Sequence, residues 1–209
     1  MSVTVEFHYD FGSPNTYYCH KVIPAVEQRT GARFHYFPIL LGGVFKATNN
    51  KSPMEQFAEV LNKKEYNALE TERFVRKHKI EGFHFNPNFP VNTLLIMRGA
   101  CYASEQDYYD RYIETMYQGM WEKALPMDDP EVVAGLLTEA GLPARDILDA
   151  TQDPEIKQRL IDNTRTSVEK GTFGSPTFYV GEEIFFGKDK IREVEEEILT
   201  AQGQQTVID

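Results

Sequence analysis

The residues whose types and spacing could do chemistry fall in two short segments that lie far apart in the chain. Residues 7–16 pass from an alternating apolar pattern through Gly12 to Ser13 and Pro14, which is typical of a strand that ends where a helix begins. Residues 174–177 read Gly-Ser-Pro-Thr ahead of a β-rich run, which favours a cis peptide bond before the proline. Together the segments predict a site built from a helix start and a proline turn.

The hydroxyl of Ser13 is the group in the first segment that could act on a ligand. At a helix amino terminus the unpaired N–H groups carry roughly half a positive charge, which favours a bound anion. A hydroxyl there can donate one hydrogen bond to a sulfur anion, so that a bound thiol would ionise more readily than a free one. The alternative is that Ser13 acts only as the N-cap of the helix.

The second segment and a later one supply groups that suit a peptide. A cis proline at position 176 would leave the backbone N–H and C=O of Ser175 free to pair with an extended cysteinyl peptide; the alternative is an ordinary strand-initiating proline. Asp189 follows Gly187 and Lys188 at the predicted start of the last helix, where it could bind an α-ammonium or serve as an N-cap. An α-ammonium and an α-carboxylate together describe the γ-glutamyl end of glutathione.

Several functions are disfavoured by composition. Cys19 and Cys101 match neither a disulfide framework nor a metal-ligand spacing, so we expect reduced thiols, no metal site and a cytoplasmic protein. The formal net charge of −10 argues against binding to nucleic acid, which needs clustered cations. The sequence shows no secretory signal and no run near the ~20 apolar residues that span a bilayer, so we expect no membrane partner.

The elements that must position these residues follow from hydrophobic periodicity and from turn residues. The predicted strands are 3–9, 34–41, 177–180 and 183–186, and residues 42–43 and 48–53 are predicted as loops. The predicted helices are 14–29 with a kink at Pro24, 53–78, 92–104, 106–122, two shorter ones that begin near Pro130 and Pro143, 154–170, and a last one after Gly187. The hairpin at the carboxy terminus excludes a Rossmann order of strands.

This order of elements describes an α/β chain with a thioredoxin-like fold and an all-helical domain inserted after the first βαβ unit. We expect residues 1–45 and 171–209 to form the thioredoxin-like domain and residues 46–170 to form the inserted helical domain. In a redox-active chain of that fold a C-x-x-C motif occupies the first segment, but here Ser13 and Thr16 stand in both places. A hydroxyl cannot form a disulfide, so the scaffold is expected to hold the thiol of another molecule.

The motifs also support a closer resemblance. Residues 7–14, 49–53, 85–87, 174–178 and 185–190 are similar to those of 2-hydroxychromene-2-carboxylate isomerases and kappa-class glutathione transferases, within the larger family of disulfide-oxidoreductase-like proteins. The resemblance spans nearly the whole chain. It implies that the cofactor is glutathione and that the protein is a homodimer.

The resemblance also implies roles for individual residues. Ser13 matches the serine that holds the glutathione sulfur. The other contacts that it implies are Asn50 near the thiol, Ser175 and Pro176 at the cysteinyl backbone, and Lys188 and Asp189 at the γ-glutamyl group. Two residues depart from the pattern, since Ser175 replaces an apolar residue and Lys188 replaces a small polar one.

The activity implied is that of a glutathione-dependent isomerase, in which the glutathione thiolate adds reversibly to an aromatic carboxylate substrate. A kappa-class-like glutathione transferase and a non-catalytic thiol-peptide binding protein are the alternatives. The substrate is expected against the helical domain, in an apolar slot with a few polar anchors. The residues predicted for this slot are Phe45, Lys46, Lys51, Phe83, Phe85, Asn86, Phe89 and Arg98.

Overall fold

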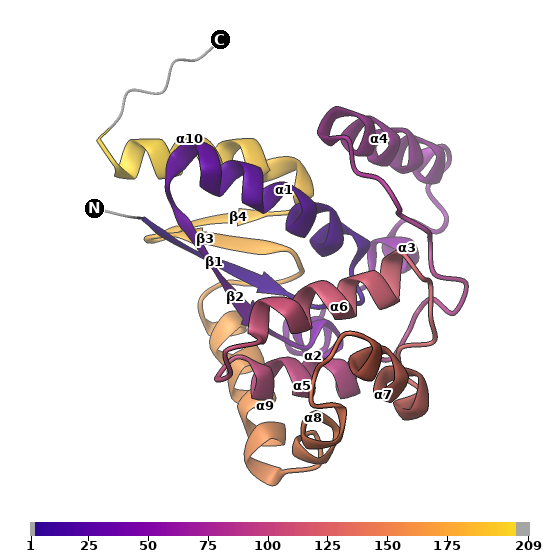
Figure 1. The fold of residues 1–209 in the computed structure, drawn as a ribbon. Coiled ribbons are helices and arrows are strands. Elements are labelled where there is room, and N and C mark those ends of the chain that lie inside the picture. The colour runs from indigo at the N-terminus through magenta and orange to yellow at the C-terminus, as the bar shows by residue number, and fades with distance from the viewer. Residues whose placement is uncertain (1–2, 204–209) are drawn as a thin grey trace.

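A computed structural model describes residues 3–203 and places a four-stranded sheet at the centre of the molecule (Figure 1). The strand order is β2-β1-β3-β4; β1 pairs parallel with β2 and antiparallel with β3, and β3 pairs antiparallel with β4. The four strands are β1 (Thr4–Tyr9), β2 (Arg33–Pro38), β3 (Thr177–Val180) and β4 (Glu183–Phe186). The predicted strands and the hairpin at the carboxy terminus are confirmed.

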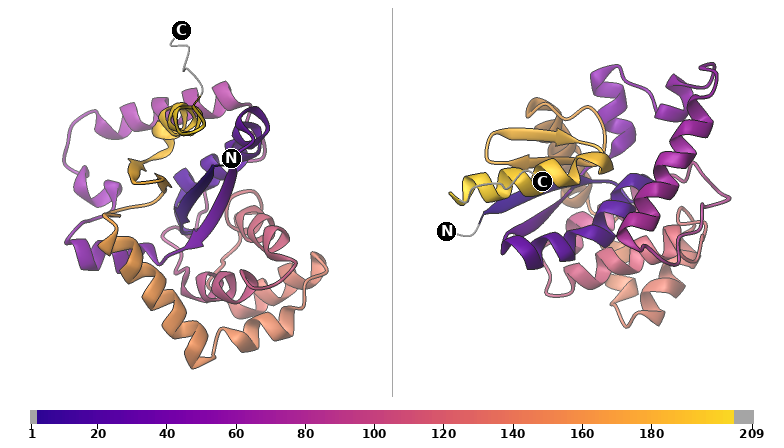
Figure 2. Two further views of the ribbon diagram at one scale, coloured as in Figure 1. Left: turned by 90° about the vertical axis from the view of Figure 1, so that its left-hand side faces the viewer. Right: turned by 90° about the horizontal axis from the view of Figure 1, so that it is seen from above.

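Helices cover both faces of this sheet. Helices α1 (Pro14–Thr30) and α10 (Ile191–Ala201) lie side by side on one face, and α5 (Leu94–Ala103) and α9 (Pro154–Glu169) pack against β2 on the other (Figures 1 and 2). The helices between β2 and β3 are α2 (Leu41–Thr48), α3 (Pro53–Gln56), α4 (Lys63–His78), α5 (Leu94–Ala103), α6 (Tyr109–Trp121), α7 (Pro130–Glu139), α8 (Ala144–Ala150) and α9 (Pro154–Glu169). The division of the chain into domains at residues 45 and 171 stays a prediction, and residues 1–2 and 204–209 lie outside the described residues.

The loop prediction was confirmed for residues 49–52 but wrong for residues 42–43 and 48, because residues 41–48 form α2. The two glycines at the start of α2 are poor helix formers, but a residue far away in the sequence caps this helix. The Leu41 N–H donates to the Asp10 carboxylate at 2.7 Å, which satisfies an otherwise unpaired donor and puts negative charge at the helix amino terminus. A cap supplied by another element cannot be seen in the local sequence.

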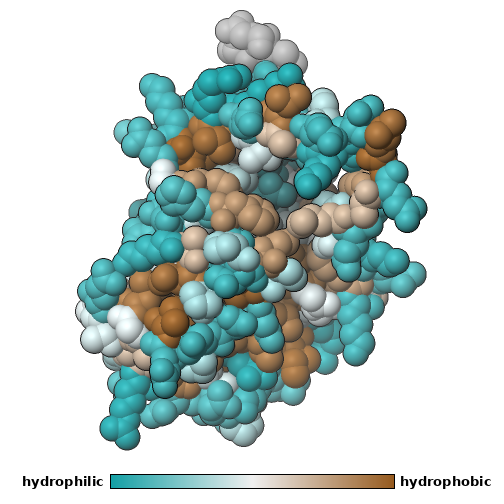
Figure 3. All heavy atoms as spheres, turned by 90° about the vertical axis from the view of Figure 1, so that its right-hand side faces the viewer, coloured by the Kyte–Doolittle hydropathy of each residue, from teal (hydrophilic) through white to brown (hydrophobic). Residues whose placement is uncertain are grey.

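The single helix predicted over residues 53–78 was also wrong. The segment forms α3 and α4 with a break between them, and Asn62 at the break adopts the left-handed conformation with φ of 66°. Asparagine tolerates that conformation better than most residues. Hydrophobic side chains are exposed here, among them Met54 at 62% and Leu61 at 86%. On the face that carries α4, Figure 3 shows hydrophobic side chains in separate groups among hydrophilic ones.

A buried histidine ties β1 to the end of α9. His8 has no exposed area; its Nδ1 lies 2.7 Å from Ser167 Oγ and its Nε2 lies 2.9 Å from Glu6 Oε2. Because a carboxylate only accepts hydrogen bonds, Nε2 carries the hydrogen and Nδ1 accepts from the Ser167 hydroxyl. Lys170 also pairs with Glu6 at 2.6 Å. These contacts explain the polar face of an interior strand.

This histidine should make the stability of the protein depend on pH. Burial lowers the pKa of His8 from 6.5 to about 4, so the unfolded chain binds a proton that the folded chain rejects between those values. The contribution is fully present above pH 6.5 and falls as the pH drops, by about 2 kcal/mol between pH 7 and pH 5. Urea unfolding of the wild type should show this loss, and the His8→Gln variant should lack it.

The exposed His84, in the segment between α4 and α5, provides the matched control for that measurement. The His84→Gln variant should keep the pH dependence of the wild type. If the wild type and the His8→Gln variant lose stability in parallel as the pH falls, the interpretation of His8 is wrong.

Candidate active site

The structure brings the two predicted segments together. The Ser13 hydroxyl, at the amino terminus of α1, donates a hydrogen bond to the Ser175 carbonyl at 3.1 Å. The Ser175–Pro176 peptide bond is cis, as predicted. Ser13 and Ser175 are 6% and 8% exposed, so both lie at the edge of solvent. Ser13 occupies the N-cap position of α1, but its side chain caps no backbone N–H, so the interpretation that it acts only as an N-cap was wrong.

Two backbone donors next to this contact are left without partners. Pro14 has no N–H, and the Asn15 N–H in the first turn of α1 has no acceptor among residues 3–203. The Ser175 N–H likewise has none within that range. Because the first N–H groups of a helix have no partner inside the helix, donors of this kind beside a hydroxyl suit an anionic or peptide ligand.

A buried carboxylate that the sequence did not single out holds the Ser13 loop. Asp10 is 1% exposed; its Oδ1 accepts from the Gly12 N–H at 2.8 Å and its Oδ2 accepts from the Leu41 N–H at 2.7 Å. Burial raises the pKa of Asp10, and these hydrogen bonds oppose the rise. A Cβ at Gly12 would lie 3.0 Å from the methyl group of Thr93, the residue before α5, so a larger residue would fit only if the Thr93 side chain shifted. The Asp10 carboxylate therefore joins the loop to the start of α2.

Two further contacts fix the loop from inside the protein. Thr16 has no exposed area, and its hydroxyl lies 2.8 Å from the Asp10 carbonyl and 2.7 Å from the Ser13 carbonyl, to which it donates. The Trp121 indole N–H donates to the Phe11 carbonyl at 2.7 Å. Thr16 therefore faces away from any ligand, and Ser13 is the hydroxyl that can meet one.

Asn50 lies on the other side of the proline turn. Its Nδ2 donates to the Phe173 carbonyl at 2.8 Å, and its Oδ1 accepts from the Lys51 N–H at 2.8 Å. Phe173 is 44% exposed, and its ring centroid lies 4.5 Å from that of Phe186, which is 41% exposed. This aromatic pair was not predicted from the sequence. In the structure a Cβ at position 174 would lie 2.6 Å from the Phe186 ring, so Gly174 leaves room for that ring.

The segment before α10 also reaches the proline turn. The Gly187 N–H donates to the Pro176 carbonyl at 2.9 Å, and a 3₁₀ turn, η1 (Lys188–Lys190), follows. Asp189 lies inside that turn and caps no helix, so the N-cap alternative was wrong. The Asp189 side chain is 65% exposed and pairs with Lys188, whose side chain is 5% exposed and whose Nζ lies 5.0 Å from the Phe74 ring centroid.

The residues predicted for a substrate slot fall into separate groups, because Phe83, Phe85 and Phe89 gather around the Trp121 ring and the residues on or near α2 and α5 do not join them. Phe83 stacks on the buried Trp121, with ring centroids 5.9 Å apart. Phe85 is 55% exposed and contacts Phe89 at 5.2 Å. Asn86 has no exposed area, and its amide donates to two backbone carbonyls, which shows that it holds its own loop. Apart from these, Phe45, Lys46 and Lys51 lie on or just after α2 and Arg98 lies on α5.

Burial keeps both thiols in the protonated form, which is a poor nucleophile. Burial raises the pKa of the Cys19 thiol far above its ordinary value and that of Cys101 to about 12. Residues 3–203 contain no group of three His, Cys, Asp or Glu side chains placed to hold a metal ion. None of the helices in that range is both long and apolar enough to cross a bilayer.

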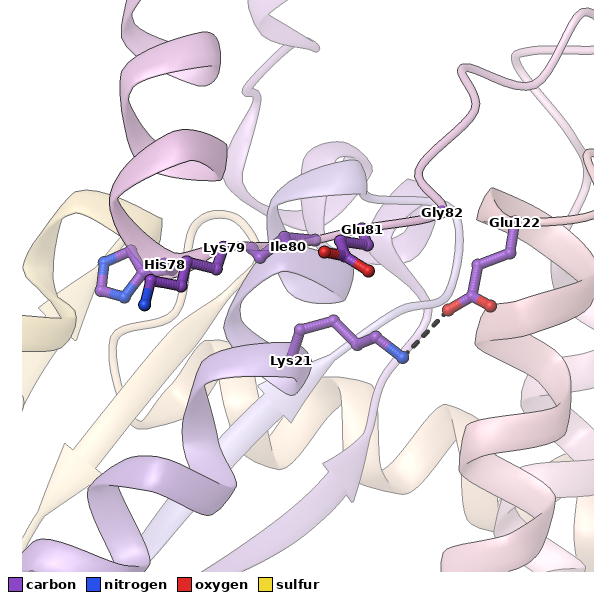
Figure 4. Close-up of a pocket in the computed structure, with 7 residues that line it drawn as sticks. All are labelled: Lys21, His78, Lys79, Ile80, Glu81, Gly82 and Glu122. Atoms are coloured by element: carbon purple, nitrogen blue, oxygen red, sulfur yellow. Dashed lines mark ion pairs between the residues drawn. The ribbon is translucent and has the colours of Figure 1, made fainter.

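A surface pocket of about 530 Å³ lies apart from Ser13, between α1 and residues 78–82. Lys21 from α1 and Glu122 from the end of α6 point toward each other across it and form an ion pair of 2.9 Å (Figure 4). The Tyr17 hydroxyl donates to the same carboxylate at 3.0 Å. Because these charged groups already neutralise each other, we assign no ligand to this pocket.

Comparisons with known proteins give the same relationships as the motifs. The family model described as DSBA-like thioredoxin domain matches residues 4–199. The 2-hydroxychromene-2-carboxylate isomerase of Sphingobium xenophagum is 25% identical over 95% of this chain and 100% of its own length. Glutathione S-transferase kappa 1 of Homo sapiens is 21% identical over 83% of this chain and 79% of its own length. A solved 2-hydroxychromene-2-carboxylate isomerase structure superposes with a TM-score of 0.80 at 22% identity, covering 96% of this chain and 94% of that one.

Proposed function

Because this chain belongs to the DSBA-like thioredoxin domain family, we propose that it binds glutathione at Ser13 and acts as a glutathione-dependent isomerase. The observation that carries the proposal is the hydrogen bond of 3.1 Å between the Ser13 hydroxyl and the Ser175 carbonyl, in a site without a cysteine pair. It supports a place where the thiol of another molecule lies against both segments. Relatives named as isomerases and as a glutathione transferase support an enzyme of this family.

The residues present fit a glutathione thiol. The Ser13 hydroxyl can rotate from the Ser175 carbonyl to a sulfur anion, since a hydroxyl hydrogen turns freely. That rotation leaves both the N–H and the C=O of Ser175 available to pair with a cysteinyl backbone. The unpaired Asn15 N–H and the amino terminus of α1 add positive potential. Bound glutathione would supply the thiolate that adds reversibly to the substrate and lets a double bond rotate.

The γ-glutamyl group would lie at Asp189. The Asp189 carboxylate is exposed and can accept from an α-ammonium, whereas the Lys188 ammonium is buried against Asp189 and the Phe74 ring. We therefore assign Lys188 to positioning Asp189 rather than to direct contact. The Gly187–Pro176 hydrogen bond connects this group to the cysteinyl site.

We expect the Asp189→Asn variant to bind glutathione about tenfold more weakly, because one charge-assisted hydrogen bond is lost. Isothermal titration with reduced glutathione measures the change. The dipeptide cysteinylglycine lacks the γ-glutamyl group and should bind both proteins equally. The exposed Asp149 on α8 gives the control variant Asp149→Asn, which should bind as the wild type does. Equal affinity of the wild type and Asp189→Asn for glutathione would contradict the assignment.

The substrate is proposed to be a small aromatic carboxylate that lies beside the proline turn. Among the predicted residues, Phe45 on α2 is connected to the proline turn by hydrogen bonds. Its carbonyl accepts from the Asn50 N–H at 3.0 Å, and the Asn50 side chain donates to the Phe173 carbonyl. Lys46 is the next residue on α2. The exposed Phe173–Phe186 pair offers an aromatic surface at the same turn. A homodimer and a cytoplasmic location are further proposals, which sedimentation and cell fractionation test.

A kappa-class-like transferase is the alternative, favoured by the relative named glutathione S-transferase kappa 1. Product analysis with 2-hydroxychromene-2-carboxylate separates the two activities. An isomerase should produce trans-o-hydroxybenzylidenepyruvate, require glutathione and leave its concentration unchanged. A transferase would consume glutathione in proportion to product. Binding of glutathione without turnover of either kind would identify a thiol-peptide binding protein instead, and turnover that needs no glutathione would contradict the whole proposal.

A further inference from the structure

A groove of about 460 Å³ lies between α2, α5 and α9. Its volume falls within the roughly 300–1,000 Å³ that small-molecule sites enclose. None of the residues that line it takes part in the contacts of Ser13 or Ser175. The apolar residues of the lining come from all three helices and the residue before α2: Leu40, Gly43, Ala47, Leu94, Leu160, Ile161 and Val168.

Two of the three cations that line the groove have no acid partner among residues 3–203. They are Arg98, whose Nε is also buried without a hydrogen-bond partner in that range, and Lys157. Arg165 pairs with Asp162 at 2.8 Å and with Glu169 at 3.9 Å. Glu169 is the only carboxylate in the lining, against three cations. In a chain of net charge −10, this excess of positive charge is local.

The remaining polar side chain of the lining, Thr164, already has its hydrogen-bond partners within the protein. The Thr164 hydroxyl donates to the Leu160 carbonyl at 2.7 Å and accepts from the Leu40 N–H at 3.0 Å. A ligand would therefore meet apolar surface and cations. Because the Nε of Arg98 is buried, a carboxylate in the groove would meet the outer end of the guanidinium, where the two Nη groups match its two oxygens.

We propose that this groove binds an amphipathic monocarboxylate, with its carboxylate on Arg98 and its flat apolar body against Leu94, Leu160 and Ala47. Lys157 adds positive charge at the same wall. A single negative charge fits the groove better than a phosphate ester does, because most of the lining is apolar and cannot replace the water around a doubly charged group. The site is independent of glutathione.

The test uses 2-naphthoate as the probe in isothermal titration without glutathione. The wild type should bind it saturably, and Arg98→Met, which keeps an apolar stem, should bind about tenfold more weakly or worse. Uncharged 2-naphthamide should bind the wild type more weakly than 2-naphthoate does, and should bind Arg98→Met and the wild type alike. Ala47→Phe, which fills the groove from an exposed position, should abolish binding of the probe.

Arg145 supplies the matched control, because it is an exposed arginine on α8 and does not line the groove. Arg145→Met should keep the affinity of the wild type for 2-naphthoate. Circular dichroism checks the fold of each variant, and Lys157→Met replaces Arg98→Met if that variant fails to fold. The proposal is overturned if the wild type does not bind the probe, if the cation variants bind it unchanged, or if Ala47→Phe alters sedimentation, which would show that a second copy covers the groove.

Discussion

Replacing Ser13 with alanine should lower the rate of the glutathione-dependent reaction near neutral pH by about ten- to a hundredfold while the fold stays intact. The hydroxyl is the side-chain donor that the site offers to the sulfur, and its loss raises the pKa of the bound thiol. The direction of the effect can be tested, because the reaction rate of the variant should recover as the pH rises and more of the bound thiol ionises. The pH–rate profile should therefore shift upward by about one to two units.

The Ser13→Cys variant should keep the fold, because the two side chains have similar volumes, but it should disturb thiolate binding. Ser52→Ala is the control, since Ser52 caps α3 on the exposed surface and should leave the profile unchanged. Unchanged pH–rate profiles in both Ser13 variants would remove Ser13 from the reaction.

Replacing Asp10 with alanine should lower the free energy of unfolding by about 3 kcal/mol, because the buried N–H groups of Gly12 and Leu41 both lose their acceptor. The same change should impair glutathione binding, since the Ser13 loop and the start of α2 lose their connection. Urea unfolding measures the first effect and isothermal titration the second. Asp10→Asn should be milder, because its amide oxygen keeps one of the two hydrogen bonds.

The pH dependence of this effect has a defined sign. Burial raises the pKa of Asp10, so the folded protein holds that proton more tightly than the unfolded chain. The cost of burying the charge is therefore present above the folded pKa and disappears as the pH falls through it. Asp128→Ala, at an exposed loop carboxylate, is the control and should unfold as the wild type does. If Asp10→Ala unfolds at the same urea concentration as the wild type, the role given to Asp10 is wrong.

The strands and most helices could be predicted because their hydrophobic periodicity is local. The start of α2 could not, since the carboxylate that caps it lies 31 positions earlier in the chain. The break before α4 depends on the left-handed conformation of Asn62, which a polar helical pattern conceals. The polar residue His8 in the interior strand β1 is explained only by its hydrogen bond with Ser167 on α9, which is far away in the sequence.

The candidate site likewise contains residues that the sequence could predict and residues that it could not. Ser13 and the cis peptide bond before Pro176 could be predicted, because each has a local motif. The role of Asp10 could not, since one of its two partners, Leu41, begins another element 31 positions later in the chain. The burial of Lys188, which separates its role from that of Asp189, depends on the Phe74 ring from α4. Long-range contacts of this kind leave no periodic signal in a single sequence.

The central claim is that the Ser13 hydroxyl and the amino terminus of α1 stabilise the sulfur anion of a bound thiol. Titration of protein-bound glutathione, followed by the ultraviolet absorbance of the thiolate, tests it directly. The account predicts a pKa at least about one unit below that of the free thiol in the wild type, and a return toward the free value in Ser13→Ala. An identical pKa for bound glutathione in both proteins would contradict it.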